Sequence, residues 1–318
     1  MLRFALRRLG TAAATLLGSA TLVFFLTALT PGDPARLLSG GPGRPAPSRQ
    51  ELAAFRAGLG LDRPLPARYA TWLRRAAALD LGRSFRDARP VRERIAETLP
   101  LTLALNLSAL ALATLAGIPL GIASALRPGS RLDRSAGWLA DVLFAVPGFV
   151  LGLSLLVLVA GELRLVPVFS DPSAGPSAFL LPVVTLAAAA LAPISRVTRN
   201  LVAEALRTPP ALAGLTRGEG RAGSVARALR ASSGGFAGLY SALVPGAAAG
   251  SVLVERVFSF PGSGALLAEA VFARDYPVVL GLTLVTGAIV VLSSLAADLV
   301  AAWLDPRLAD GARREDAA

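Results

Sequence analysis

The chain has 318 residues, 54% of them hydrophobic and 17% charged, with a mean hydropathy of +0.60 and a formal net charge of +11. This composition is too apolar for an ordinary soluble domain and favours a polytopic membrane protein. Cysteine, histidine and lysine are absent. Their absence excludes disulfides, a thiol nucleophile, a histidine base and a nucleotide-binding P-loop, whose lysine contacts the phosphates.

Six stretches without charged residues are long enough to cross a membrane. A hydrocarbon layer of about 30 Å needs roughly 20 residues of helix. Backbone amides in lipid must be satisfied within their own segment, and these stretches show none of the alternation of barrel strands. We therefore expect an all-α polytopic membrane protein with six transmembrane helices. The stretches are 9–32, 98–126, 142–161, 172–195, 231–254 and 276–297.

The arginines predict which ends of these helices face the cytoplasm. With the N-terminus inside, the short inside segments carry most of the arginines, and the short outside segments carry only Arg164, Arg256 and Arg274. The positive-inside rule then places both termini and the loop after the fourth span in the cytoplasm. The segment 31–97 is too long for the rule to be informative.

The same stretches divide the chain into parts. The first span is expected to be kept as an anchor, because it is long and lacks a convincing cleavage site for a signal peptide. The parts are a first transmembrane helix over 1–30, an external segment with short helices over 31–97, a five-helix core over 98–304 that includes a cytoplasmic loop over 196–234, and a cytoplasmic tail over 305–318.

The external segment contains signals for short helices. Ser48 and Glu51 form a capping-box pattern that starts one helix, and a second is expected over 66–79. Tyr69 and Trp72 suit a membrane interface. A third helix starts near residue 91, with a shared apolar face formed by Val91, Ile95 and Leu99.

Prolines and glycines within the spans predict irregular and closely packed helices. Glycines four residues apart, such as Gly117 and Gly121, let helix backbones approach closely in lipid. Prolines are expected to kink or end their helices at Pro147, Pro182, Pro193 and Pro245.

The arginine-rich cytoplasmic loop contains two predicted short helices. Thr208 is expected to cap the first helix, over 209–218. Ser224 is expected to cap the second helix, over 225–230, and the Ser-Ser-Gly-Gly sequence at 232–235 to stop it. Helices of this length are marginal alone in water, so lipid headgroups or a protein groove must hold them. The residues alone leave open both a loop that touches anionic lipid and a coupling element that inserts into a cytoplasmic motor.

Several long segments occur in one order over nearly the entire chain. They are "RRLG", "TPGDPA", "LGLDRPLPARYATWLRRAAALDLGRSFRDARPVRERIAETLPLTLAL", "GIPLGIASALRPGSRLDR", "VERVFSFPGSGALLAEAVFARDYPVVLG" and "DLVAAWLDPR". In these segments the chain resembles the membrane permease subunits of ATP-binding-cassette importers of the dipeptide, oligopeptide and nickel class. The resemblance implies a type I importer permease fold and no catalytic or metal site.

The resemblance also implies partners and a location. They are a second homologous permease subunit, more often different than identical, two ATP-binding-cassette ATPase subunits, and an extracytoplasmic solute-binding protein, in the lipid of the plasma (inner) membrane. No nucleic acid is expected. This chain would bind no cofactor, because ATP and Mg are used by the ATPase subunits. Peptide is the family's commonest solute, with nickel and glutathione as further possibilities.

Three groups of site residues follow from the resemblance. The cytoplasmic loop would couple to the ATPase through Arg207, Thr208, Ala211, Gly214, Leu215, Val225, Arg227, Leu229 and Arg230. The usual Lys, His and Asn of the family's loop are absent here, and a Pro-Pro pair shifts the spacing. The binding protein would face Glu255, Pro261, Gly262 and Asp275, with a turn at 261–262 and Asp275 capping the last span. Polar residues that could line the pathway, or bond a neighbouring helix instead, are Asn106, Ser108, Ser154 and Ser241.

Two other classes compete with this interpretation. An intramembrane protease would need a catalytic pair, and the only candidates, Asp141 and Asp298, lie near helix ends where a carboxylate can reach water. A carrier driven by a proton or sodium gradient is the more serious alternative. Such carriers keep ionisable groups at mid-membrane, whereas the centres of all six stretches are uncharged.

Overall fold

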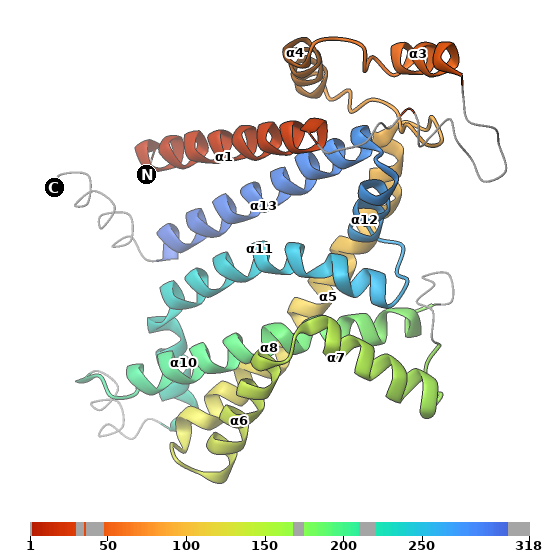
Figure 1. The fold of residues 1–318 in the computed structure, drawn as a ribbon. Coiled ribbons are helices and arrows are strands. Elements are labelled where there is room, and N and C mark those ends of the chain that lie inside the picture. The colour runs from red at the N-terminus through yellow and green to blue at the C-terminus, as the bar shows by residue number, and fades with distance from the viewer. Residues whose placement is uncertain (1, 30–34, 36–47, 168–174, 210–219, 305–318) are drawn as a thin grey trace. The chain divides into compact units, whose positions relative to one another are not determined.

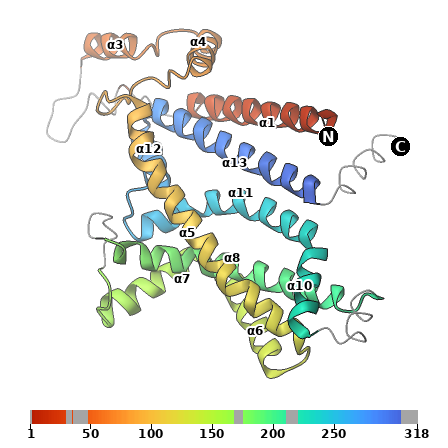
Figure 2. The same cartoon turned by 180° about the vertical axis from the view of Figure 1, so that it is seen from behind.

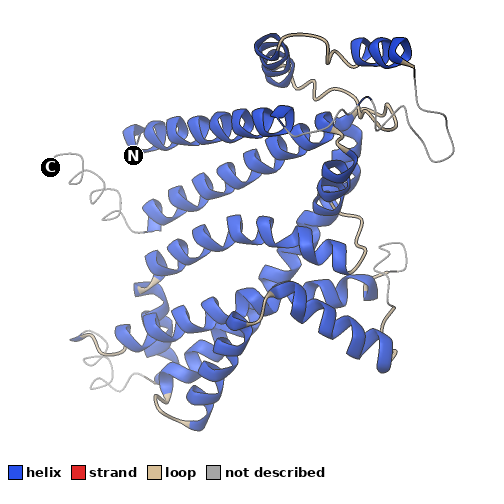
Figure 3. Cartoon of the chain, in the orientation of Figure 1, coloured by secondary structure: helices blue, strands red, loops and turns tan. Residues whose placement is uncertain are grey.

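The computed structural model describes residues 2–29, 35, 48–167, 175–209 and 220–304, and the regular elements within these ranges are helices (Figures 1 and 3). In chain order they are α1 (Leu2–Leu29), α3 (Arg49–Gly58), α4 (Leu65–Ala77), α5 (Val91–Leu126), α6 (Arg131–Ala145), α7 (Gly148–Leu155), the π-helix η1 (Leu156–Glu162), α8 (Ser177–Ala205), α10 (Arg221–Ala231), α11 (Ser233–Val257), α12 (Ser263–Ala273) and α13 (Tyr276–Leu304). The prediction of an all-α fold is confirmed.

Four of the described helical segments are long and apolar enough to cross a membrane. They are Leu9–Leu29, Val91–Leu126, Ser177–Ala205 and Tyr276–Ala297. Helices α6 and α7–η1 pass the same test together, which raises the number of candidate spans to five. Most of the predicted span over 231–254 lies in α11, which begins two residues later, at Ser233, and is 25 residues long.

The third predicted span differs in detail from the structure. Residues 142–161 do not form one unbroken helix, because α6 ends at Ala145, α7 begins at Gly148, and their axes differ by 99°. Pro147 lies at the break, as its missing N–H and ring clash lead one to expect. In contrast, α8 continues through Pro182 and Pro193, since neighbouring helices can satisfy the backbone groups that a proline frees.

Contacts divide the chain into two units, which are described separately. Unit 1 contains Met1–Ala12, Leu103–Phe260 and Val290–Ala318, and unit 2 contains Ala13–Thr102 and Pro261–Ile289. Helix α5 begins in unit 2 and ends in unit 1.

Unit 1 is organised around α8, which packs against α6, α7, α10 and α11 (Figures 1 and 2). One apolar cluster joins α5 to α8 through the buried residues Ala109, Ala113, Ala187 and Ile194. A second joins η1, α8 and α11 through Ala160, Leu181, Val254 and Phe258.

Two glycines bring the backbones of α5 and α8 together. A Cβ atom on Gly117 would lie 2.8 Å from Cγ2 of Ile194, and one on Gly121 would lie 2.5 Å from the carbonyl oxygen of Ser195 and 2.7 Å from Cβ of Thr198. No side chain fits at these distances. The expectation that glycines four residues apart permit close helix packing is confirmed for this pair.

Unit 2 has its own apolar core. Buried residues of α5, α12 and α13 form it, namely Val91, Ile95, Leu266, Ala270, Val278, Val279 and Leu282, with Leu99 packed at the edge. The predicted apolar face at the start of α5 is therefore confirmed. The predicted capping box is also present, because Ser48 N donates to Oε2 of Glu51 (2.8 Å) and Glu51 N donates to Oγ of Ser48 (3.2 Å).

Aromatic side chains attach α4 to α1 within unit 2. The ring centroid of Phe24 lies 5.2 Å from that of Tyr69 and 5.4 Å from that of Trp72. The hydroxyl oxygens of Tyr69 and Thr21 are 2.7 Å apart, within hydrogen-bond distance. The interfacial aromatic pair expected from the sequence thus packs against the first predicted span.

Candidate functional site

The α8–α10 junction lies at the C-terminal end of α8 and is built from small apolar residues. Ala125 of α5, Val202 of α8 and Ala228 of α10 are buried against one another, and Leu229 packs at their edge. The hydroxyl of Ser232 also donates to the carbonyl of Leu201 at 3.4 Å. A short basic helix is thereby held on the end of a long apolar one (Figure 2).

The structure places the predicted coupling residues on both sides of this junction. Arg207 and Thr208 are exposed just after α8, where the Thr208 hydroxyl donates to the carbonyl of Ala205 at 2.7 Å. Pro209 is helical, in agreement with a helix that starts there. The remaining residues of that predicted helix, with the candidates Ala211, Gly214 and Leu215, lie outside the described residues.

The second predicted helix exists but begins earlier than expected. Val225, Arg227, Leu229 and Arg230 lie on α10, of which Arg230 is exposed. The prediction that Ser224 caps this helix is wrong, because Gly220 occupies the N-cap position and Ser224 is buried inside the helix. The predicted stop at 232–235 shrinks to Ser232 alone, since α11 starts at the next residue.

An ion pair that the sequence analysis did not single out fixes the same end of α8. Nε of Arg199 lies 2.5 Å from Oδ1 of Asp133, and Nη2 of Arg199 lies 2.8 Å from Oδ2. The Asp133 side chain is only 7% exposed. The spacing Ser130-x-x-Asp133 is a capping pattern that could have identified the aspartate, but no local pattern identifies its arginine partner.

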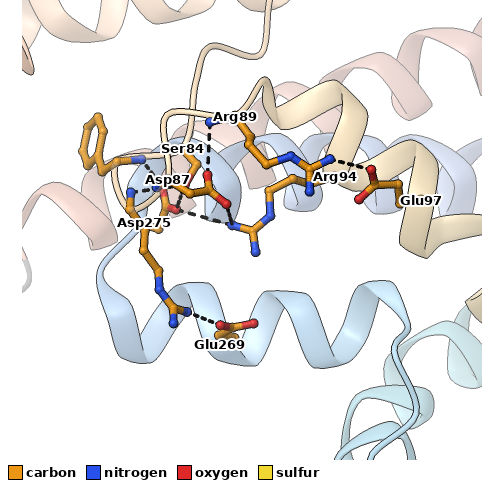
Figure 4. A network of polar contacts seen from close by, with 9 residues as sticks. Ser84, Asp87, Arg89, Arg94, Glu97, Glu269 and Asp275 are labelled. Carbon is orange, nitrogen blue, oxygen red and sulfur yellow. Dashed lines mark hydrogen bonds and ion pairs between the residues drawn. The ribbon is translucent and has the colours of Figure 1, made fainter. Parts of the chain in front are cut away.

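A second polar network lies in unit 2 and contains one of the predicted residues (Figure 4). The carboxylate of Asp275 is buried and accepts hydrogen bonds from the Ser84 hydroxyl (2.5 Å) and the backbone N–H of Phe85 (2.9 Å). Nη1 of Arg94 lies 3.9 Å from Oδ2 of Asp275 and 3.6 Å from Oδ2 of Asp87. The residues after α4 are thereby fixed to the turn between α12 and α13.

The predicted role of Asp275 as a cap needs correction. Its backbone carbonyl accepts the N–H of Val279 in the first turn of α13, but its carboxylate bonds the loop at 84–85. The turn predicted at Pro261 and Gly262 does precede a helix, α12. Of the four residues expected to face a binding protein, only Pro261 is exposed, whereas Glu255, Gly262 and Asp275 are buried.

Electrostatics favour an ionised Asp87 in this network. Burial acts to raise the pKa of Asp87, but the hydrogen bonds from Arg89 and Ser84 and the charges of Arg94 and Arg89 outweigh it. The pKa of Asp87 therefore lies below its usual range. At neutral pH the carboxylate is charged and can hold both its backbone donor and Arg94.

The four candidate pathway residues lie on three helices, α5, α7 and α11. Ser108 lines an open cavity of about 570 Å³ in unit 1, together with Gly175, Pro176, Phe179, Leu180 and Val183. The Ser154 hydroxyl donates to the carbonyl of Val150 in its own helix at 2.9 Å, which fits the alternative of a helix-bonded serine. Asn106 lies two residues before Ser108 on α5, and Ser241 lies on α11.

Comparison with known proteins decides the family. A family model described as "Binding-protein-dependent transport system inner membrane component" matches residues 117–310, and a model of the N-terminal part of such membrane components matches residues 1–106. The chain belongs to the binding-protein-dependent inner membrane components. It is therefore a multi-pass membrane permease of a transport system, and its family is a non-catalytic one that works with a binding protein and with ATPases.

Individual members of the family are similar over the full length. The chain is 35% identical to a putative peptide permease protein of Brucella suis biovar 1 (strain 1330) over 319 residues. It is 33% identical to the dipeptide transport system permease protein DppB of Escherichia coli (strain K12) over 342 residues, and 32% identical to the glutathione transport system permease protein GsiC of Salmonella paratyphi A (strain ATCC 9150 / SARB42) over 318 residues. In each case the match covers 97% of this chain and 99% of the relative. The resemblance inferred from the sequence is confirmed.

Proposed function

We propose that this chain forms half of the translocation pathway of an ATP-driven importer for peptides or a similar small solute. The relatives named for dipeptide, peptide and glutathione transport support this solute class. The observation that carries the proposal is the α8–α10 junction, where a basic surface helix is fastened by Ala228 to the end of an apolar span. Movement of a cytoplasmic partner bound to such a helix would displace the helix, and the packing at Ala228 would displace α8 with it.

The proposed topology has six spans with both termini in the cytoplasm, as in the type I importer fold. The five candidate spans of the structure, with α6 and α7–η1 taken as one, leave α11 as the sixth. Four spans precede the α8–α10 junction and six precede the C-terminus. Because both numbers are even, the junction and the two termini lie on the same side of the membrane. The parts would then be the first helix over 1–30, the external segment over 31–97, the core over 98–304 and the tail over 305–318.

The proposed partners follow from this arrangement. An ATPase subunit would bind the coupling loop, residues 207–230, as one of two such subunits in the importer, and a solute-binding protein would bind the opposite side near Pro261. A second, homologous permease would complete the pathway. ATP and Mg would be bound by the ATPase subunits alone. Closure of those subunits would move α10 and α8 together as a rigid body and change which side the central cavity opens to.

The test uses the complete importer, assembled from the products of the neighbouring genes and reconstituted in liposomes. Uptake of a radiolabelled dipeptide is expected to require internal ATP and external binding protein. Gly214→Arg is expected to abolish uptake and co-purification of the ATPase while leaving membrane insertion unchanged. Ala54→Arg, which adds the same side chain to the exposed surface of α3, should retain the ATPase.

Two outcomes would contradict the proposal. Uptake by Gly214→Arg at the wild-type rate would argue against docking through the loop. Uptake driven by an imposed proton gradient without any ATPase would favour an ion-driven carrier instead.

A further inference from the structure

The end of α8 is tied to α6 by two ion pairs of very different character, both within unit 1. Arg199 pairs with Asp133, whose side chain is 7% exposed, through two nitrogen–oxygen contacts. Arg196 pairs with Asp141, whose side chain is 68% exposed, through one contact. Exposed single-contact pairs contribute little to stability, whereas a two-point arginine–carboxylate contact also fixes the relative geometry of the two side chains.

Asp133 does more than neutralise an arginine. Its Oδ2 also accepts the backbone N–H of Gly129 (2.9 Å), and its own N–H donates to Oγ of Ser130 (3.2 Å). Gly129 has φ +75°, a conformation that a side chain would strain. The aspartate therefore sets the turn between α5 and α6 and binds that turn to α8.

The position of Arg199 on α8 links this turn to the α8–α10 junction. Its backbone nitrogen lies 3.0 Å from where a Cβ on Gly121 would be, so α5 and α8 are in direct backbone contact at this level. Less than one turn further along α8, Val202 packs against Ala228 of α10. The Asp133–Arg199 pair therefore connects the part of α8 that packs on α10 to the start of α6.

We propose that Asp133 is a positioning residue for coupling, which transmits movement of α8 to α6 and the bent α6–α7 pair. This inference rests on the proposed function and deepens it. Without the two-point contact, α8 could follow α10 while α6 stays behind. ATP hydrolysis would then continue with weaker linkage to the permease bundle.

The test measures how strongly the binding protein and dipeptide stimulate ATP hydrolysis by the complete importer in lipid nanodiscs. The readout is the ratio of ATP hydrolysis with binding protein and dipeptide to hydrolysis without them. Asp133→Asn keeps an acceptor for Gly129 N–H but loses the charge, and it is expected to lower the ratio by roughly fivefold, the lower end of typical coupling effects. Basal hydrolysis, co-purified ATPase and thermal stability should stay near the wild-type values.

Two further variants separate positioning from a general structural role. Arg199→Lys keeps the charge but not the two-point contact, and it should lower the ratio by less than Asp133→Asn. Asp141→Asn removes the exposed pair between the same two helices and should leave the ratio unchanged.

The outcomes are distinct. A wild-type ratio in Asp133→Asn, or an equal fall in all three variants, would overturn the inference. If Asp133→Asn fails to assemble, Arg199→Lys decides, with a wild-type ratio as the contrary result. A wild-type importer that shows no stimulation would instead contradict the proposed function, and the inference with it.

Discussion

The hydroxyl of Ser84 donates a hydrogen bond to the carboxylate of Asp275, which lies 191 positions later in the chain. Both side chains are buried, and the backbone N–H of Phe85 donates to the other carboxylate oxygen at 2.9 Å. A single aspartate therefore satisfies one buried and one partly buried donor of the loop that precedes α5. If the turn between α12 and α13 moved away from this loop, the Ser84 hydroxyl and the Phe85 N–H would lose their hydrogen-bond acceptor.

Asp275→Ala is expected to destabilise unit 2 by about 1–3 kcal/mol, because a buried hydroxyl and a partly buried N–H lose their acceptor. Hydrogen exchange of the amides of residues 84–89 in the detergent-solubilised chain should accelerate. Glu269→Ala removes an exposed ion pair with Arg86 nearby and should leave exchange almost unchanged. Slow exchange in Asp275→Ala would contradict the assigned role.

Acid should loosen the same loop through Asp87. Because its pKa is lowered in the folded protein, its contribution to stability is present above the pKa of the unfolded chain and is lost as the pH falls through the folded value. We expect the protection of residues 84–89, taken relative to the intrinsic exchange rate at each pH, to fall on acidification below about pH 4. In Asp87→Asn this additional loss of protection should be absent. An identical acid response in both proteins would rule out Asp87 as its source.

Gly121→Ala is expected to destabilise the bundle by about 1–3 kcal/mol, as overpacking does elsewhere. The new methyl group would meet a backbone carbonyl and the Thr198 side chain, neither of which can rotate away. Gly137→Ala on α6 is the matched control, since a Cβ there meets nothing within 4 Å and alanine favours helix. Thermal unfolding in detergent should separate the two variants; equal midpoints would refute the close contact.

Tyr69→Phe and Trp72→Ala should loosen α4 from α1 to different extents. The first removes only the contact with the Thr21 hydroxyl and is expected to cost about 1 kcal/mol. The second removes a ring packed on Phe24 and should cost more. Limited proteolysis within 59–64, between α3 and α4, is the measurement. Greater sensitivity in Tyr69→Phe than in Trp72→Ala would contradict this ranking.

The spans could be predicted because charge cannot be placed cheaply in lipid. Gaps between charged residues located α1, α5, α8 and α13, and a single proline located the break between α6 and α7. The pattern of apolar residues gives no measure of the 99° bend between them, because it carries no information on how α6 and α7 each pack against α8.

The sites were harder to predict because their partners are distant in sequence. The helix in the second half of the loop was foreseen, but its start was misplaced by four residues, since Ser224 faces the interior while Gly220 takes the N-cap. Asp133 and Arg199 are 66 positions apart, and no local pattern connects them. Asp275 is predicted as a cap of the last span, whereas its carboxylate bonds a loop about 190 positions earlier that no local pattern connects to it.

The close backbone contact between α5 and α8 at Gly121 and Ser195, called the seam here, also limits how this permease can be redesigned. A mutant library aimed at new cargo would naturally include inward positions of α5. At 117 and 121, however, every residue larger than glycine would separate two backbones that touch. Useful diversity on α5 is therefore expected near Ser108, beside the open cavity, rather than along this seam.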